Sequence, residues 1–207
     1  MNTPAAAGGR AQHWDRTYEE RGEHDVSWFQ QEPTTSLELI DALGVPRDAA
    51  VLDVGGGASR LVDHLLARGY TDLTVLDVSH VALDLARARV GDEHVTWVAT
   101  DLLRWEPQRS YALWHDRAVF HFLTDDTDRR AYLETLRRAV PDGAVIIATF
   151  APDGPDTCSG LPVARYGPDE LAALLEGFEV LDHRREVHHT PWDTAQPFTF
   201  VAARRVR

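Results

Sequence analysis

The stretch Val51-Leu52-Asp53-Val54-Gly55-Gly56-Gly57 decides the fold. A short apolar run that ends directly in three glycines predicts a buried strand followed by a tight turn. The residues that follow, 59–68, have helical character. N–H groups at the start of a helix face a ligand, and glycines let the backbone approach that ligand closely. We therefore expect a ligand-binding loop at residues 53–57.

Short β-branched runs alternate with helical segments beyond this loop. Strands are expected at 51–54, 73–76, 95–98, 111–114 and 144–150. Helices are expected at 59–68, 80–90, 126–139 and 168–175. This alternation is typical of crossover βαβ units in a parallel sheet. Two further strand candidates, 178–187 and 198–204, predict a hairpin that ends the sheet.

The length of the chain favours one domain. With 207 residues and 43% hydrophobic content, the chain can bury one full core but is short for two domains. Residues 1–9 are rich in Ala and Gly and are expected to be disordered. Residues 10–207 are then a single domain, with N-terminal helices in 10–45 and a core in 50–207. Aromatic side chains at Trp14, Tyr18, Trp28 and Phe29 either cover a binding site as a lid or pack a helix on the core.

Composition excludes several classes of partner. The formal net charge is −12, whereas nucleic-acid binders usually present a basic face, so nucleic acid is not expected as a partner. No apolar run approaches 18 residues, and residues 1–10 lack a signal-peptide layout, so a cytoplasmic protein without a membrane partner is expected. The single cysteine, Cys158, excludes an intrachain disulfide framework. His183, His188 and His189 lack convergent cysteine partners, so we expect no metal site.

Two acidic residues strengthen the interpretation of the glycine loop. Asp77 ends the second expected strand, where a carboxylate can accept both ribose hydroxyls of an adenosine. Asp101 follows the third strand, where a carboxylate can accept the exocyclic amine of adenine. An Asp after a strand is also a common helix cap or turn residue. Asp53, Asp77 and Asp101 together with the glycine loop nevertheless favour an adenosine-containing ligand.

The glycine pattern argues against a nicotinamide dinucleotide. Dehydrogenases of similar topology need G-x-G-x-x-G, in which the third glycine lets helix and strand pack closely. Counted from Gly55, that position holds Arg60. The dinucleotide fingerprint is therefore absent.

The motifs Val51–Gly57, Asp77 and Thr100-Asp101 resemble motifs I, II and III of class I S-adenosylmethionine (SAM)-dependent methyltransferases, over roughly residues 13–204. The resemblance implies SAM as cofactor and an α/β, Rossmann-like, seven-stranded, mostly parallel sheet with the last strand antiparallel and helices on both faces. It also implies that Asp53 orients the methionine amino group. The cofactor-binding residues expected from it are Trp28, Asp53, Gly55, Gly56, Gly57, Asp77, Val78, Asp101, Leu102 and His115.

Two subgroups of this family are similar in further features. Residues 111–118 and 128–132, with an N-terminal helix followed by Trp28-Phe29-Gln30, resemble the thiopurine S-methyltransferase type. The Trp28-Phe29 element and Asp116 after a strand also resemble small protein-lysine methyltransferases. The resemblance therefore leaves the methyl acceptor open.

The acceptor is expected beyond the carboxyl ends of the fourth and fifth strands. His115 and His121 are candidate catalytic bases there because imidazole titrates near neutral pH, and Asp116 could orient a cationic acceptor. A thiolate or selenolate needs no base. We therefore expect a small-molecule acceptor, with a thiol or related chalcogen slightly ahead of oxygen or nitrogen. The alternatives are protein-lysine methylation and a non-catalytic SAM-binding module.

Overall fold

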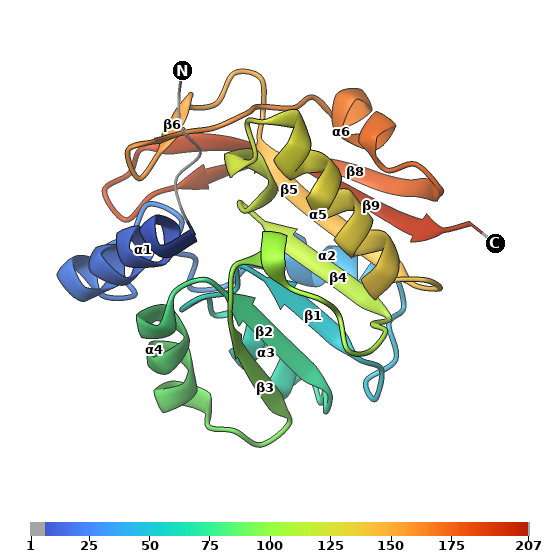
Figure 1. Ribbon diagram of the computed structural model, residues 1–207, viewed down its shortest axis with the longest axis horizontal. Helices are drawn as coiled ribbons and strands as arrows, with labels where there is room; N and C mark the ends of the chain where they lie inside the picture. The colour runs from blue at the N-terminus through green and yellow to red at the C-terminus, as the bar shows by residue number, and fades with distance from the viewer. Residues whose placement is uncertain (1–6, 207) are drawn as a thin grey trace.

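A seven-stranded sheet in the order β3-β2-β1-β4-β5-β9-β8 forms the centre of the computed structural model, which describes residues 7–206 (Figure 1). Strands β1 to β5 pair in parallel, whereas β9 is antiparallel to both β5 and β8. The predicted α/β, Rossmann-like sheet is confirmed. The strands are β1 (Val51–Val54), β2 (Leu73–Asp77), β3 (Val95–Ala99), β4 (Leu113–Arg117), β5 (Ala144–Phe150), β8 (Phe178–His189) and β9 (Ala195–Arg205).

Helices lie on both faces of the sheet and beyond its edge. They are α1 (Ala7–Arg21), α2 (Thr34–Ala42), α3 (Leu61–Ala67), α4 (His80–Val90), α5 (Asp126–Ala139) and α6 (Pro168–Leu174), with short 3-10 turns η1 (Leu102–Arg104) and η2 (Phe120–Phe122). A two-stranded ribbon, β6 (Thr157–Cys158) with β7 (Leu161–Pro162), follows β5. In Figure 1, α5 lies in front of the sheet, and α2 and α3 lie behind it.

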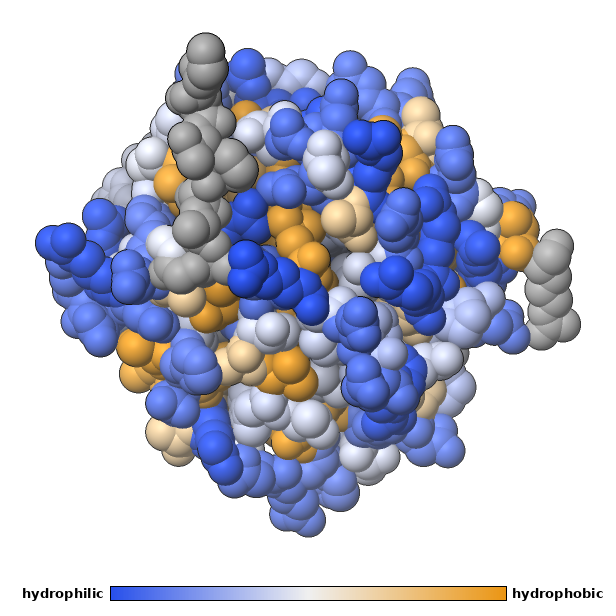
Figure 2. Space-filling model, viewed as in Figure 1, coloured by the Kyte–Doolittle hydropathy of each residue, from blue (hydrophilic) through white to orange (hydrophobic). Residues whose placement is uncertain are grey.

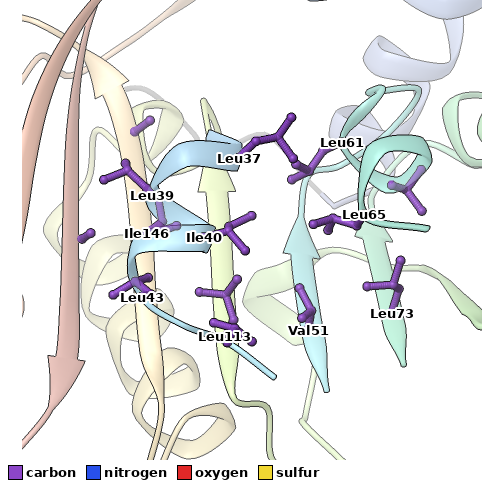
Figure 3. Close-up of a cluster of buried hydrophobic side chains, with 14 of the residues drawn as sticks. Leu37, Leu39, Ile40, Leu43, Val51, Leu61, Leu65, Leu73, Leu113 and Ile146 are labelled. Atoms are coloured by element: carbon purple, nitrogen blue, oxygen red, sulfur yellow. The ribbon is translucent and has the colours of Figure 1, made fainter. Parts of the chain in front are cut away.

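Each face of the sheet has its own apolar layer. On one face, leucines and isoleucines of α2 and α3 pack on Val51, Leu73, Leu113 and Ile146 of four neighbouring strands (Figure 3). On the other face, α5 and α6 pack through Leu136 and Leu171 among others. A strand buried on both sides must be apolar at successive positions, which explains the continuous apolar runs of β1 and β5. The two layers hold the carboxyl ends of β1, β2 and β4 in register.

The fourth strand differs from the prediction. We expected 111–114, but β4 is Leu113–Arg117, so His115 and Asp116 lie within it and not after it. The polar run His-Asp-Arg is atypical of a buried strand, and pairing with β1 and β5 on either side overrides that local preference. Side chains alternate along a strand, so His115 and Asp116 point to opposite faces of the sheet.

The N-terminal region also differs in part. Residues 7–9 are helical and begin α1, although disorder was expected for 1–9; residues 1–6 lie outside the described part of the chain. Within residues 7–206, no helix is long and apolar enough to cross a membrane. Hydrophilic residues cover most of the face shown in Figure 2, and its apolar residues form small separate patches.

Candidate functional site

The glycine loop is shaped so that side chains cannot occupy it. Gly55 has φ +65°, and a Cβ there would lie 1.9 Å from Cγ2 of Val119. A Cβ on Gly56 would lie 2.5 Å from Oδ2 of Asp53 and 2.7 Å from Cγ1 of Val75. Separations below 3.0 Å require neighbouring atoms to move. The loop therefore brings bare backbone next to the Asp53 carboxylate, as a ligand held through main-chain groups requires.

Asp53 is buried at 5% exposure and is paired with His115, which has a hydrogen-bond partner at each ring nitrogen. His115 Nδ1 lies 2.7 Å from Asp53 Oδ1, and His115 Nε2 lies 2.9 Å from the hydroxyl of Ser36 in α2. Both ring nitrogens of His115 are thus in hydrogen bonds. This arrangement fixes the Asp53 carboxylate beneath the glycine loop and gives His115 a positioning geometry, whereas we had predicted it as a base.

Asp77 ends β2 on the other side of the loop. Its Oδ1 accepts a hydrogen bond of 2.8 Å from the Ser79 N–H, and its Oδ2 lies 3.0 Å from the place of a Cβ on Gly57. Burial, with a further contribution from the charge on Asp53, raises the pKa of Asp77 to about 7. A second carboxylate therefore faces the glycine loop. Its raised pKa means that burial disfavours its charged form.

The third acid lies further along the same edge of the sheet. Asp101 caps η1 by accepting a hydrogen bond of 3.0 Å from the Leu103 N–H, and its other oxygen lies 3.4 Å from Nη1 of Arg10 in α1. Leu102 is buried beside it, and Val78 is half-buried after β2. The chain thus presents Asp53, Asp77 and Asp101 in the order of strands β1, β2 and β3 along one edge.

The N-terminal aromatic residues cover this edge as a connected cluster. The Trp28 ring meets those of Trp14 and Tyr18 edge-on, at 5.5 and 6.0 Å between centroids, and Trp14 also contacts Phe122. The Trp28 Nε1–H donates to the Tyr18 hydroxyl over 3.1 Å. That hydroxyl lies 3.0 Å from the place of a Cβ on Gly57. The predicted lid segment therefore reaches the glycine loop and also packs on α4.

Beneath this cover lies an inner cavity between the glycine loop and the end of β4. Its walls include Asp53, Gly55 and Gly56 on one side and Trp28 and Phe29 on the other. His115 and Arg117, two residues apart on β4, form its floor. The inner cavity therefore joins the predicted cofactor loop to the predicted acceptor end of the sheet.

The other two predicted catalytic residues do not line the inner cavity. Asp116 is fully buried on the α5 face, where its oxygens accept hydrogen bonds from the Val119 and Phe120 N–H groups and the Tyr132 hydroxyl. Burial raises its pKa to about 6. This placement is typical of a residue that holds the turn after β4.

His121 is fully buried in η2 against the ring of Phe150, and neither ring nitrogen has a hydrogen-bond partner. Burial, together with the charge of Arg117, lowers its pKa to about 3. His121 is therefore neutral near pH 7, and so low a pKa makes it a weak base.

An outer groove opens on the other side of Phe29 and Gln30, which line both spaces. It has a volume of about 650 Å³ and is bordered by the carboxylates of Asp25, Glu32 and Glu186. Glu186 lies 3.6 Å from Arg117 Nη2, so one ion pair stands between the two spaces. The outer groove presents the carboxylate, and the inner cavity presents the guanidinium.

Sequence reasoning assigned no site role to Ser36, placed Tyr18 only in a possible lid, and placed Arg117 at the acceptor end of the fourth strand without giving it a chemical role. Ser36 lies on α2 and Tyr18 on α1, and only the tertiary packing of these helices brings them to the loop. Arg117 was included among the residues after the fourth strand, yet nothing local distinguishes it from an exposed arginine. The signal that could have been used is its place two residues after His115, on the same face of a strand.

Comparisons with known proteins agree with this geometry. The methyltransferase domain family matches residues 51–143. EEF1A lysine methyltransferase 2 of Mus musculus is 33% identical over 198 residues, which cover 86% of this chain and 75% of that protein. The structure of 1,6-didemethyltoxoflavin-N1-methyltransferase of Burkholderia thailandensis, with bound S-adenosylhomocysteine (SAH), has a TM-score of 0.73 at 24% identity and covers 100% of this chain and 94% of that one. The N-methyltransferase NodS of Bradyrhizobium japonicum, also with SAH, has a TM-score of 0.72 at 18% identity, over 93% and 98% of the two chains.

Proposed function

Because this chain belongs to the class I SAM-dependent methyltransferases, we propose that it methylates a small molecule enclosed between β4 and the N-terminal aromatic cluster. The observation that carries the proposal is the inner cavity. It runs from Asp53 and Gly56 to Arg117 beneath Trp28 and Phe29, and its volume of about 50 Å³ means that the aromatic cover must open to admit a ligand. An acceptor at the Arg117 end would face the cofactor loop and be shielded from water, as methyl transfer requires.

The residues of the loop fit the cofactor that the family uses. We assign the methionine amino group to Asp53, which is held by His115, and His115 is in turn hydrogen-bonded to Ser36. The ribose hydroxyls are assigned to Asp77, whose carboxylate is buried beside Gly57, and the adenine amine to Asp101. The absence of side chains at Gly55, Gly56 and Gly57 leaves room for the cofactor backbone contacts. Trp28, Val78 and Leu102 supply flanking apolar surface.

SAM supplies an electrophilic methyl group on a sulfonium, so the protein's task is mainly to align a nucleophile with it. The inner cavity offers no free base, because both nitrogens of its histidine, His115, are hydrogen-bonded. That arrangement favours an acceptor that is already nucleophilic, such as a thiolate. The positive charge of Arg117 would stabilise such an anion. A thiol or related chalcogen therefore stays slightly ahead of oxygen or nitrogen.

A protein lysine is the second candidate acceptor. The likeness to a protein-lysine methyltransferase of Mus musculus favours it, and so do the carboxylates of the outer groove. The positive charge of Arg117 at the acceptor end of the inner cavity opposes it. An ammonium about 5 Å from the Arg117 guanidinium would be repelled by roughly 3 kcal/mol at an effective dielectric constant near 20. A lysine would have to lose its proton before it reached the methyl group.

A labelling experiment with tritiated SAM separates these functions. The purified protein is incubated with cell lysate, and protein and small-molecule fractions are counted separately. Label in the small-molecule fraction is expected, with none in a defined protein band. A single labelled band that disappears with the Asp77→Asn variant would show protein methylation and refute the small-molecule proposal. SAH binding without label in either fraction would indicate a non-catalytic module.

A further inference from the structure

Arg117 lines the acceptor end of the inner cavity, and the proposed function uses only its charge. It ends β4, and its side chain is 10% exposed. The guanidinium lies 4.4 Å over the ring of Phe198, and Nη1 donates to the Trp28 carbonyl over 3.2 Å. Nε and Nη2 are buried and have no hydrogen-bond partner. These two nitrogens form one edge of the planar group.

A buried guanidinium is costly when one edge has only a distant ion pair and no hydrogen bond. Charged donors removed from water without a partner cost several kcal/mol. Glu186 is the nearest carboxylate, but its Oε1 stays 3.6 Å from Nη2 and already accepts a hydrogen bond from Gln30 over 2.9 Å. Burial lowers the pKa of Arg117 and of nearby His188. The surroundings therefore supply one carboxylate at ion-pair distance and no hydrogen bond to this edge.

We propose that the Nε–Nη2 edge of Arg117 binds a carboxylate group of a ligand in the inner cavity. Two parallel N–H donors on one edge of a guanidinium match the two oxygens of a carboxylate, and such bidentate pairs are strong and directional. The edge belongs to a residue that lines the inner cavity, whereas Glu186 lines the outer groove. The ligand carboxylate completes the hydrogen bonds that the protein leaves open.

The proposal rests on the proposed function and leaves two sources for the carboxylate. One is the methionyl carboxylate of the cofactor, since Asp53 and Gly55 of the cofactor loop line the same inner cavity. The other is a carboxylate on the acceptor, placed at the end of β4. Both sources use the same edge of Arg117, and binding measurements distinguish them.

The test measures binding of three probes by calorimetry: SAH, 5′-methylthioadenosine, which lacks the amino-acid part, and benzoate added to the SAH complex. The variants are Arg117→Gln, which removes the charge and the edge, and Arg117→Lys, which keeps only the charge. Arg185→Gln is the matched control, because Arg185 is exposed and pairs with Asp153 at the surface. The control is expected to bind all three probes like the wild type.

Two results support the proposal and assign the source. If the cofactor supplies the carboxylate, Arg117→Gln weakens SAH binding by about 10- to 100-fold and leaves methylthioadenosine binding unchanged. If the acceptor supplies it, both nucleosides bind normally and benzoate binding falls by at least about 10-fold. In either case Arg117→Lys recovers only part of the loss, because a lysine ammonium lacks the planar edge.

Other results overturn the proposal. Unchanged binding of all three probes to Arg117→Gln would show that no ligand carboxylate binds this edge and that Glu186 or water accepts the hydrogen bonds of Nε and Nη2. A parallel loss of SAH and methylthioadenosine would make Arg117 a structural residue of the cavity wall. Failure of the wild-type protein to bind SAH at all would instead refute the proposed function, independently of Arg117.

Discussion

With Asp77 assigned to the ribose hydroxyls, cofactor binding should depend on pH. Its pKa of about 7 in the ligand-free protein means that near pH 6 most molecules carry a neutral carboxyl, which cannot accept both ribose hydroxyls. Only the ionised fraction is competent to bind, so SAH affinity should fall as the pH falls through 7. We expect binding about tenfold weaker at pH 6 than at pH 8, measured by calorimetry. Asp77→Asn should bind weakly at both, and a wild-type affinity that is flat from pH 6 to 8 would contradict the assignment.

The same carboxylate should lower the stability of the ligand-free protein. A folded-state pKa raised above the unfolded value means that the folded protein binds the proton more tightly, so stability is lost as the pH rises from about 4 through 7. Asp77→Asn removes this charge and keeps an oxygen for the Ser79 N–H. We expect the variant to gain on the order of 1–3 kcal/mol in free energy of unfolding at pH 8, measured with urea, and little at pH 4. Equal gains at both values would show a cause other than titration.

Gly56 should tolerate no side chain. A Cβ at 2.5 Å from Asp53 Oδ2 and 2.7 Å from Val75 forces both away, and overpacking of this kind costs about 1–3 kcal/mol. Gly56→Ala should therefore lose stability and bind SAH at least about tenfold more weakly, because the Asp53 carboxylate moves. Gly9→Ala is the control, since nothing lies within 4 Å of a Cβ there. Wild-type SAH affinity in Gly56→Ala would show that the loop has more freedom than the structure indicates.

Local sequence predicted the residues whose roles depend on position in a strand or turn. Asp53, Asp77 and the glycines could be predicted because they lie at or near the ends of predicted strands. The structure places all of them at one edge of the sheet. Ser36 was not predicted because its partner, His115, lies 79 positions away in the chain. Asp116 was expected beyond the fourth strand, but β4 continues to Arg117, so Asp116 lies within the strand. Alternation along the strand then turns its side chain to the α5 face, away from the inner cavity.

At the scale of elements, strongly patterned segments were predicted best. The helices 80–90 and 126–139 and the strands 51–54 and 144–150 agree with α4, α5, β1 and β5. Strand β4 was placed too early because Trp114, His115, Asp116 and Arg117 lack a β-branched residue, and β8 was predicted two residues short for a similar reason. The ribbon of β6 and β7 has two residues per strand, which no periodicity can reveal.

Asp15 anchors helix α1 to the start of α4, at the edge of the sheet that carries the glycine loop. Its Oδ1 accepts hydrogen bonds from the Ser79 hydroxyl over 2.7 Å and from the Val81 N–H over 3.3 Å, at the start of α4. Asp15→Ala should release α1 at a cost of about 1–3 kcal/mol and loosen the aromatic cluster over the glycine loop. We expect faster hydrogen exchange in residues 10–21 and weaker SAH binding.

The matched control for this helix is Glu20→Ala. Glu20 is 58% exposed and pairs only with Arg16 one turn away, so its removal should change stability by less than about 0.5 kcal/mol. Unchanged exchange in α1 of Asp15→Ala would mean that the aromatic contacts and the Arg10 ion pairs hold the helix without Asp15.

For the molecule as a whole, the topology explains why one edge carries the chemistry. Strands β1, β2 and β4 are parallel neighbours, so their carboxyl ends bring together acids that are far apart in sequence. The two apolar layers cover the faces of the sheet and leave that edge as the place where bare backbone and carboxylates meet. The covering α1 segment and the β8–β9 hairpin then enclose it from two sides. Although the net charge of the chain is −12, the inner cavity carries both signs, from Asp53 and Arg117.

A ligand that binds only the folded protein raises its melting temperature by mass action, so the whole fold reports which cofactor it prefers. SAH at 100 times its dissociation constant adds about 2.7 kcal/mol, which for a domain of this size corresponds to roughly 5–10 °C. NAD should give no shift. Arg60 occupies the place where a dinucleotide loop needs its third glycine, and its guanidinium is bound to Glu23 and Asp63. Asp77→Asn should lose most of the SAH shift in the same scan, and a shift with NAD that exceeds the one with SAH would refute the assignment of the loop to SAM.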